Sequence, residues 1–100
     1  MSDDSLSRCT ERQGQFLTFI HLYTLLNGRL PAEDDMQCFF RVTGPVVHQM
    51  VLALERNGLI SRMPGMARSI QLLISAAQLP ELHPANQQPV RSRRMHRFVV

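Results

Sequence analysis

The spacing of apolar residues changes once along this sequence of 100 residues, at Asn57-Gly58, and the change limits the folds open to the chain. Before it, apolar residues recur every three or four positions in three successive segments, as the buried face of a helix requires. After it, residues 59–63 and 69–73 alternate like strands, and residues 64–68, which include Pro and Gly, join them. The sequence therefore predicts three helices followed by one β-hairpin.

The first helical segment carries signals at both of its ends. Thr10 and Gln13 have the spacing of a capping box, in which each side chain binds the backbone N–H of the other residue. Asn27-Gly28 predicts an end in the left-handed conformation, which glycine adopts without strain. The apolar residues of the predicted buried stripe are Phe16, Leu17, Ile20, Tyr23 and Leu26.

Two shorter helices follow, and a four-residue turn over 41–44 separates them. Pro31 and the acidic residues 33–35 suit the first turn of the second helix, because carboxylates favour the positive end of the helix dipole. Pro45 is expected at the first position of the third helix, where a missing N–H is tolerated. The buried positions expected in the two helices are Met36, Phe39, Phe40, Val47, Met50, Val51 and Leu54.

These elements predict a mainly α protein with a small β-hairpin. Their order is that of a winged helix-turn-helix, with three helices and a two- or three-stranded wing. We expect residues 1–9 to be a flexible leader and residues 10–75 to form the winged-helix domain. Residues 76–100 are expected to contain a short helical turn and a basic tail, with little order from Pro84 onward.

Charge is distributed unevenly along the chain. Residues 1–55 have a net charge of −3 and residues 56–100 a net charge of +6, and every basic residue is Arg. Arg binds phosphate oxygens with two parallel hydrogen bonds and enters narrow minor grooves. The second half of the chain therefore favours a polyanionic partner, although a solvated basic face would have the same composition.

Other classes of protein are disfavoured by the sequence. The longest apolar stretch, residues 16–26, is interrupted by polar residues and is shorter than the roughly 20 residues of a membrane span. The leader has no hydrophobic segment of a secretory signal, which predicts a cytoplasmic protein. Cys9 and Cys38 lack the spacing of zinc ligands, so two free thiols are expected rather than a metal site or a disulfide. Because no nucleophile or phosphate-loop motif occurs, we expect no enzyme activity, cofactor, metal or small-molecule ligand.

Five short segments, in the same order and at the same spacing, resemble the DNA-binding domain of LexA-type repressors. Residues 10–13 (TERQ) are similar to the T-x-R-Q opening of that domain, and residues 28–31 (GRLP) are similar to its G-x-x-P link. Residues 47–60 (VHQMVLALERNGLI) resemble its V-H-x-x-L-x-A-L-E-x-x-G-x-I pattern almost position for position. Residues 64–65 and 68–72 look like its wing. The similarity covers roughly two-thirds of the chain.

The resemblance implies a protein that binds double-stranded DNA and regulates transcription, with its third helix in the major groove and its wing on the backbone or minor groove. The residues that it places nearest DNA are Thr43, Gly44, Val46, His48 and Gln49 in the helix and Arg62 and Arg68 in the wing. Gln49 suits adenine, and Val46 suits a thymine methyl group. The second helix and Ala32 depart from the family's pattern, so no target sequence is carried over. The family's self-cleaving Ser/Lys peptidase domain, which also dimerises, has no counterpart in these residues.

Several alternatives stay open at this point. A winged helix can be a protein-interaction module that never binds DNA. His48 can hydrogen-bond within the domain, and Arg62 and Arg68 can belong to a solvated hairpin. We expect weak self-association through Leu22, Leu25, Leu52 or the segment after Ile74. The Arg-rich tail (Arg91, Arg93, Arg94 and Arg97) is predicted to add affinity for DNA without sequence choice, and single-stranded nucleic acid is its alternative ligand, with Phe98 alone for stacking.

Overall fold

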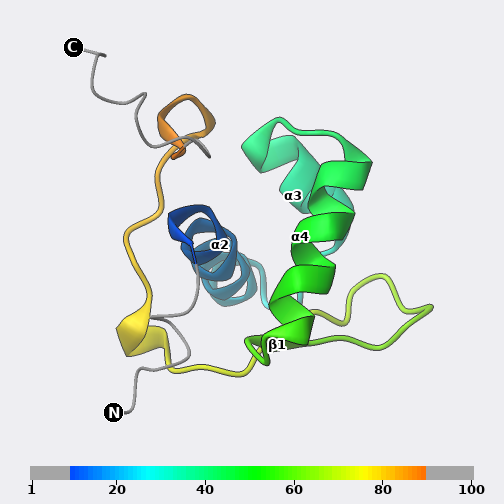
Figure 1. The fold of residues 1–100 in the computed structure, drawn as a ribbon. Helices are drawn as coiled ribbons and strands as arrows, with labels where there is room; N and C mark the ends of the chain where they lie inside the picture. Colours follow the sequence, from blue (N-terminus) through cyan, green and yellow to red (C-terminus); the bar gives the residue numbers. More distant parts are fainter. Residues whose placement is uncertain (1–9, 90–100) are drawn as a thin grey trace.

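Three helices and one short hairpin follow one another in the computed structural model, which describes residues 10–89 (Figure 1). The helices are α2 (Glu11–Asn27), α3 (Glu33–Phe40) and α4 (Gly44–Arg56). The strands β1 (Ile60–Ser61) and β2 (Gln71–Leu72) pair antiparallel, with Ile60 opposite Leu72. This architecture confirms the predicted winged helix-turn-helix, with a two-stranded wing. The leader over residues 1–9 and the Arg-rich residues 90–100 lie outside the described part.

Helix α2 has the predicted capping box and the predicted end. Thr10 Oγ1 accepts a hydrogen bond from the Gln13 N–H at 3.0 Å, and Gln13 Oε1 accepts one from the Thr10 N–H at 3.1 Å. Gly28 ends the helix with φ 70°. All seven residues from Gly14 to Ile20 are buried, whereas Leu26 is 79% exposed. The predicted burial of Leu26 is wrong, because the last turn of α2 extends beyond the part of the helix that the core covers.

Helices α3 and α4 are joined by a turn that is one residue shorter than predicted. Arg41 ends α3 in the left-handed conformation, with φ 57° and ψ 50°. Thr43 is the N-cap of α4, so the turn comprises residues 41–43 and Gly44 belongs to the helix. Pro45 consequently occupies the second helical position rather than the first. Its missing N–H is tolerated there too, because the first four N–H groups of a helix have no partner within the helix.

The end of α4 directs the chain into the wing. Gly58 has φ 75° and donates its N–H to Glu55 O at 3.0 Å, and Leu59 donates its N–H to Leu54 O at 3.0 Å. This pair of bonds is a Schellman motif, which places the side chains before and after the glycine together. Leu54 and Leu59 are both fully buried, so the motif brings β1 against the core.

The core lies between the three helices and the base of the wing. Phe16 and Phe40 stack at its centre with ring centroids 4.0 Å apart and an interplanar angle of 11°. Burial of each large side chain contributes roughly 1.5–3 kcal/mol. The remaining large buried residues are Leu17, Phe19, Ile20, Met36, Val47, Val51, Leu54, Leu59, Ile60 and Ile70.

The strands of the wing are shorter than the five residues predicted for each, because a side chain takes over the hydrogen bonds at the tip. Ser69 Oγ accepts a hydrogen bond from the Met63 N–H at 2.8 Å and lies 3.2 Å and 2.9 Å from the Met63 and Met66 carbonyl oxygens. The Met66 N–H donates to Met63 O at 3.0 Å, and Gly65 between them has φ 85°. The tip is therefore a tight turn pinned by one hydroxyl group.

Residues 79–89, here named the strap, run back along the outer side of α2 (Figure 1). The buried Gln15 holds them: its Nε2 donates to Glu81 O at 2.8 Å, and its Oε1 accepts from the His83 N–H at 2.8 Å. Thr18 Oγ1 donates to Pro80 O at 2.8 Å. Two 3₁₀ turns, Ala76–Gln78 and Ala85–Gln87, flank this contact. Residues 84–89, for which little order was expected, continue this path, and Gln88 Nε2 donates to Gln15 Oε1 at 2.8 Å.

Candidate functional site

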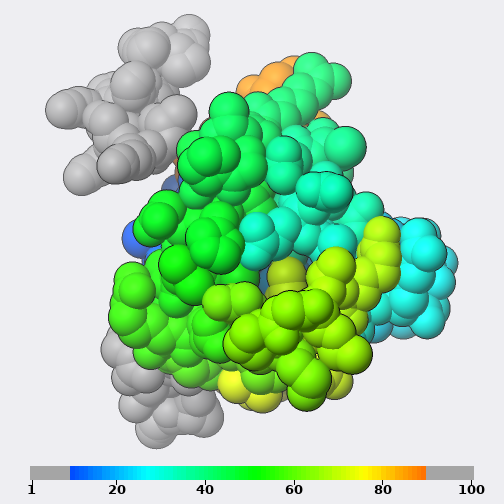
Figure 2. Space-filling model, turned by 90° about the vertical axis from the view of Figure 1, so that its right-hand side faces the viewer, coloured from blue at the N-terminus to red at the C-terminus, as the bar shows by residue number. Residues whose placement is uncertain are grey.

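Helix α4 has one buried face and one exposed face, and the exposed face is the candidate site (Figure 2). Val47, Val51 and Leu54 are fully buried. With 100° between successive residues, Gln49 lies opposite them, near the middle of the exposed face. Val46, His48, Gln49 and Arg56 are exposed on this face, and Leu52 and Ala53 on the same face are half-buried.

The N-terminal end of this face is held close to α3. A Cβ atom on Gly44 would lie 3.4 Å from Gln37 Nε2, so glycine allows the start of α4 to approach α3. Thr43 is exposed directly before the helix. The structure thus brings five predicted residues together at one end of α4: Thr43, Gly44, Val46, His48 and Gln49.

His48 makes a contact within the domain. Its Nδ1 lies 3.2 Å from Glu33 Oε2, which joins α4 to the first turn of α3. The two side chains are 48% and 31% exposed, so the pair lies at the surface and solvent screens it. Of the alternatives left open for His48, the hydrogen bond within the domain is therefore present.

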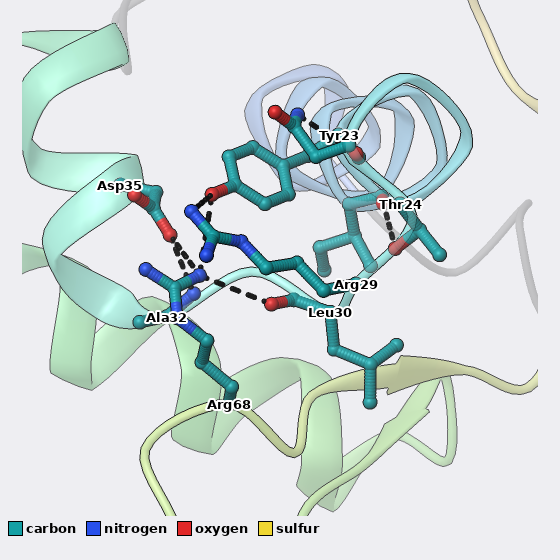
Figure 3. A network of polar contacts seen from close by, with 9 residues as sticks. Tyr23, Thr24, Arg29, Leu30, Ala32, Asp35 and Arg68 are labelled. Atoms are coloured by element: carbon teal, nitrogen blue, oxygen red, sulfur yellow. Dashed lines mark hydrogen bonds and ion pairs between the residues drawn. The ribbon is translucent and has the colours of Figure 1, made fainter.

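The two wing arginines are also paired with carboxylates. Arg62 Nε lies 3.0 Å from Glu55 Oε1 on α4. Arg68 Nη1 donates to Asp35 Oδ2 at 2.8 Å, to Leu30 O at 3.1 Å and to the Tyr23 hydroxyl at 3.2 Å (Figure 3). We name these four residues, Tyr23, Leu30, Asp35 and Arg68, the latch, since they tie the far end of the wing loop to α2 and α3.

The latch changes the ionisation of Asp35. Burial raises the pKa of this carboxyl group, but the hydrogen bonds from the Ala32 N–H and from Arg68 lower it by more. The pKa of Asp35 consequently lies below its ordinary value of 3.8. The Asp35 Oδ2–Ala32 N distance is 2.8 Å, so the carboxylate also caps α3, where Ala32 has no side chain that could do so.

With both arginines drawn inward, the tip of the wing is apolar. Residues 63–67 (MPGMA) carry no charge, and Met63 and Met66 are 57% and 56% exposed. The wing therefore presents two methionine side chains outward and its cations toward the body of the domain.

Two features of this surface were missed by the sequence analysis. A groove between α2 and α4 borders the exposed face, and its lining residues are Gln13, Pro45, Val46, Gln49, Met50 and Ala53. Arg41 is exposed beside the N-terminal end of this face and Arg56 on the face itself, and in the described part of the chain neither makes an ion pair. The left-handed turn at Arg41 gave no signal in the sequence, because this conformation is uncommon for any residue other than glycine.

Other kinds of site find little support in residues 10–89. None of the helices there is both long and apolar enough to cross a membrane. No three of the His, Cys, Asp and Glu side chains described are grouped as metal ligands would be. Cys38 is an exposed free thiol, and Cys9 lies outside the described residues.

Comparison with known proteins supports one family. The chain is 38% identical over 68 residues to the LexA repressor of Thermosipho melanesiensis and 40% identical over 68 residues to that of Thermosipho africanus. It is 33% identical over 73 residues to the LexA repressor of Bartonella quintana. These matches cover 68% to 72% of this chain but only 29% to 34% of the relatives, so the chain spans about a third of their length. No family model matches the sequence.

The similarity and the fold agree in their details. The matched length is that of the three helices and the wing, and the helix order, the capping box and the glycine after α4 all occur as the resemblance implied. Residues 10–89 of this chain therefore contain a LexA-like winged helix-turn-helix domain.

Proposed function

We propose that this chain binds double-stranded DNA and regulates transcription, with the exposed face of α4 in the major groove. The observation that carries the proposal is this face itself: a helix held from behind by a fully buried stripe presents Val46 and Gln49 to solvent, beside the turn that joins it to α3. This is how a helix-turn-helix presents its second helix to base edges. The similarity to LexA repressors points to the same function.

In this proposal, the individual residues have distinct roles. Gln49 reads adenine through its amide, and Val46 contacts a thymine methyl group. Thr43, Gly44 and Arg41 lie at the phosphate backbone beside the N-terminus of α4. His48 is oriented by Glu33. Arg62 and Arg68 remain paired with their carboxylates and hold the wing in the position where it contacts the backbone or minor groove of the DNA.

Selection of bound fragments from a pool of random duplex DNA tests the proposal. We expect an enriched motif in which the positions read by α4 are specified. The number and spacing of the half-sites in this motif then give the oligomeric state of the bound protein. Equal retention of all fragments, or preference for single-stranded DNA, would contradict sequence-specific duplex binding.

A second candidate function is a protein-interaction module that binds no DNA. The observation in its favour is electrostatic: residues 10–89 contain six Arg and six Asp or Glu, so the described domain has no net charge. Leu25 and Leu26, which are 66% and 79% exposed at the end of α2, offer an apolar surface for such a partner. Binding to duplex DNA that weakens steeply as salt is raised would rule against this function, because such dependence reports released counterions.

A further inference from the structure

The tip of the wing, residues 63–67, is apolar although the proposed ligand of the domain is a polyanion. None of these five residues carries a charge, and Met63 and Met66 are 57% and 56% exposed. Apolar surface in water is unfavourable unless a partner covers it. The two methionine side chains therefore offer a contact surface of a different kind from the arginines on either side of them.

The backbone of the tip has few groups to offer to a phosphate. The Met63 N–H donates to Ser69 Oγ at 2.8 Å, and the Met66 N–H donates to Met63 O at 3.0 Å. Pro64 has no N–H. Three of the five residues of the tip are thus unable to donate a backbone hydrogen bond to a phosphate oxygen. Because these polar groups are satisfied within the loop, the tip suits surroundings less polar than the DNA backbone.

The residues directly before and after the tip are both fastened to helices. Arg62 Nε lies 3.0 Å from Glu55 Oε1 on α4, and Arg68 is held by the latch to α2 and α3. Ser69 pins the turn between them. A loop that is held in this way loses little conformational freedom on binding, so more of its contact energy appears as affinity. The inward-facing arginines therefore hold the methionines in place.

The wing lies beside the face of α4 that we propose to read DNA. It begins at the C-terminal end of α4 and projects to the side of that helix (Figure 1), and the two lie next to each other on one face of the molecule (Figure 2). The minor groove faces the same side of a duplex half a helical turn, or about five base pairs, from the centre of the major groove. With α4 in the major groove, the tip is thus placed to reach the neighbouring minor groove.

We propose that Met63 and Met66 form an apolar wedge that enters this minor groove and partly unstacks one base step beside the bases read by α4. This inference rests on the proposed function of α4. Methionine is unbranched and adapts to a narrow space, and apolar wedges of this kind kink DNA from the minor groove. Unstacking costs least at pyrimidine–purine steps such as TA and CA/TG. The wing therefore selects deformable DNA at positions where no hydrogen bond reads a base.

The preference for a deformable step is tested with duplexes that carry the selected motif and differ only in its flanks. A TA step is moved through the flanking positions of an otherwise rigid A-tract. We expect the wild type to bind roughly tenfold more tightly when the step lies about five base pairs from the centre of the bases read by α4. Met63→Ser combined with Met66→Ser should remove this preference. The matched control, Met63→Leu combined with Met66→Leu, keeps two apolar side chains and should retain it.

Unstacking itself is measured with 2-aminopurine in place of the adenine of the TA step. Its fluorescence should rise when the wild type or the Leu variant binds and stay unchanged with the Ser variant. The slope of log affinity against log salt should be the same for all three proteins, because no phosphate contact is altered. Circular dichroism melting of the three should also agree, since both side chains are exposed in the folded domain.

Each outcome decides between the two proposals. A full chain that binds no duplex DNA overturns both. A wild type that selects a motif but shows neither a flanking step preference nor a rise in fluorescence overturns the wedge and leaves the function of α4 intact. A Ser variant with weaker affinity but the wild-type step preference also overturns it, since the methionines then only support the wing. Loss of self-association in the Ser variant, measured by sedimentation without DNA, would assign the tip to a second copy of the chain instead.

Discussion

At the scale of single residues, α4 exposes one amide at the position best suited to reading a base. Gln49 lies opposite the buried Val47, Val51 and Leu54, so its amide faces away from the core. Val46 and Ala53 beside it are apolar and contribute shape rather than hydrogen bonds. If α4 reads DNA as proposed, discrimination between bases by this helix depends on few groups.

Gln49→Ala should weaken binding to the selected motif by about 1–3 kcal/mol and leave non-specific affinity nearly unchanged, because a two-pronged contact with adenine is lost. Fluorescence anisotropy with the selected and a scrambled duplex measures both quantities. Gln71→Ala, which removes an exposed amide on β2, is the matched control and should have no effect. An equal loss of affinity for both duplexes would show that Gln49 does not read a base.

Arg41 combines backbone strain with an exposed charge, and substitution can separate the two. A left-handed conformation strains any residue with a Cβ atom, so Arg41→Gly should stabilise the domain by about 0.5–1 kcal/mol. The same change should weaken DNA binding and flatten its salt slope by about 0.9 if Arg41 contacts one phosphate. Arg41→Ala should lose the same affinity without the gain in stability. Urea unfolding and anisotropy give the two readouts, and unchanged affinity in both variants would show that Arg41 does not contact DNA.

At the scale of elements, the latch couples the wing to the two helices that support α4. Arg68 comes from the far end of the wing loop, Tyr23 from α2 and Asp35 from the first turn of α3 (Figure 3). Movement of the wing therefore requires three contacts of Arg68 to break together. The orientation of the Met63–Met66 tip relative to α4 depends on this arrangement and not on the two-residue strands alone.

Asp35→Asn should loosen the wing and lower the free energy of unfolding by about 1 kcal/mol at neutral pH, after allowance for solvent screening of a partly exposed group. Since the pKa of Asp35 is lowered in the folded state, its contribution is present at pH values above 3.8 and is lost as the pH falls through the lower folded value. The difference in the free energy of unfolding between the wild type and the variant should therefore shrink as the pH falls below about 4, which is near the ordinary pKa of an aspartate side chain.

The control for this prediction is Asp34→Asn, which removes a carboxylate from the same helical turn but outside the latch. Thermal melts over pH 3–7 compare the two variants, and hydrogen exchange of residues 62–69 reports the wing. Equal effects of the two variants at every pH would mean that the helix dipole, rather than the latch, accounts for the contribution of Asp35.

The elements of this fold could be predicted from the sequence where the signal is local. The Thr10/Gln13 box, Gly28 and Gly58 mark helix ends by their own conformational preferences, and each end occurs as expected. The strap could not be predicted, because Gln15 has no feature that distinguishes it from an exposed glutamine until Glu81 and His83 are brought beside it. The pairing of Arg62 and Arg68 was missed for the same reason: their partners lie 7 and 33 residues away.

At the scale of the whole molecule, surface composition bears on assembly. A single helix-turn-helix covers few base pairs, and two half-sites usually provide high specificity. Leu25 and Leu26 remain exposed, whereas Leu22 and Leu52 are half-buried. Within the segment after Ile74, residues 79–89 lie along α2 as the strap. Of the surfaces considered for self-association, the end of α2 is therefore the most available.

We expect weak self-association through the end of α2, and Leu25→Ser combined with Leu26→Ser should abolish it. Sedimentation velocity over a range of concentrations, with and without DNA, measures the change. Met63→Ser combined with Met66→Ser is the matched control, because it removes two similarly exposed apolar side chains from the wing. A strict monomer both free and on DNA would contradict the prediction.

The strap also makes the domain suitable for circular permutation. Because Pro89 lies against Arg12, the two ends of the described fold meet at one place on the surface. A short linker from residue 89 to residue 10 would close the backbone into a ring with little disturbance, and the exposed wing tip at Gly65 would provide new termini. In such a circular permutant, the contacts of Gln15 with Glu81 and His83 become local in sequence. The domain should then fold faster while keeping the same structure, because the strap no longer has to close the longest loop of the chain.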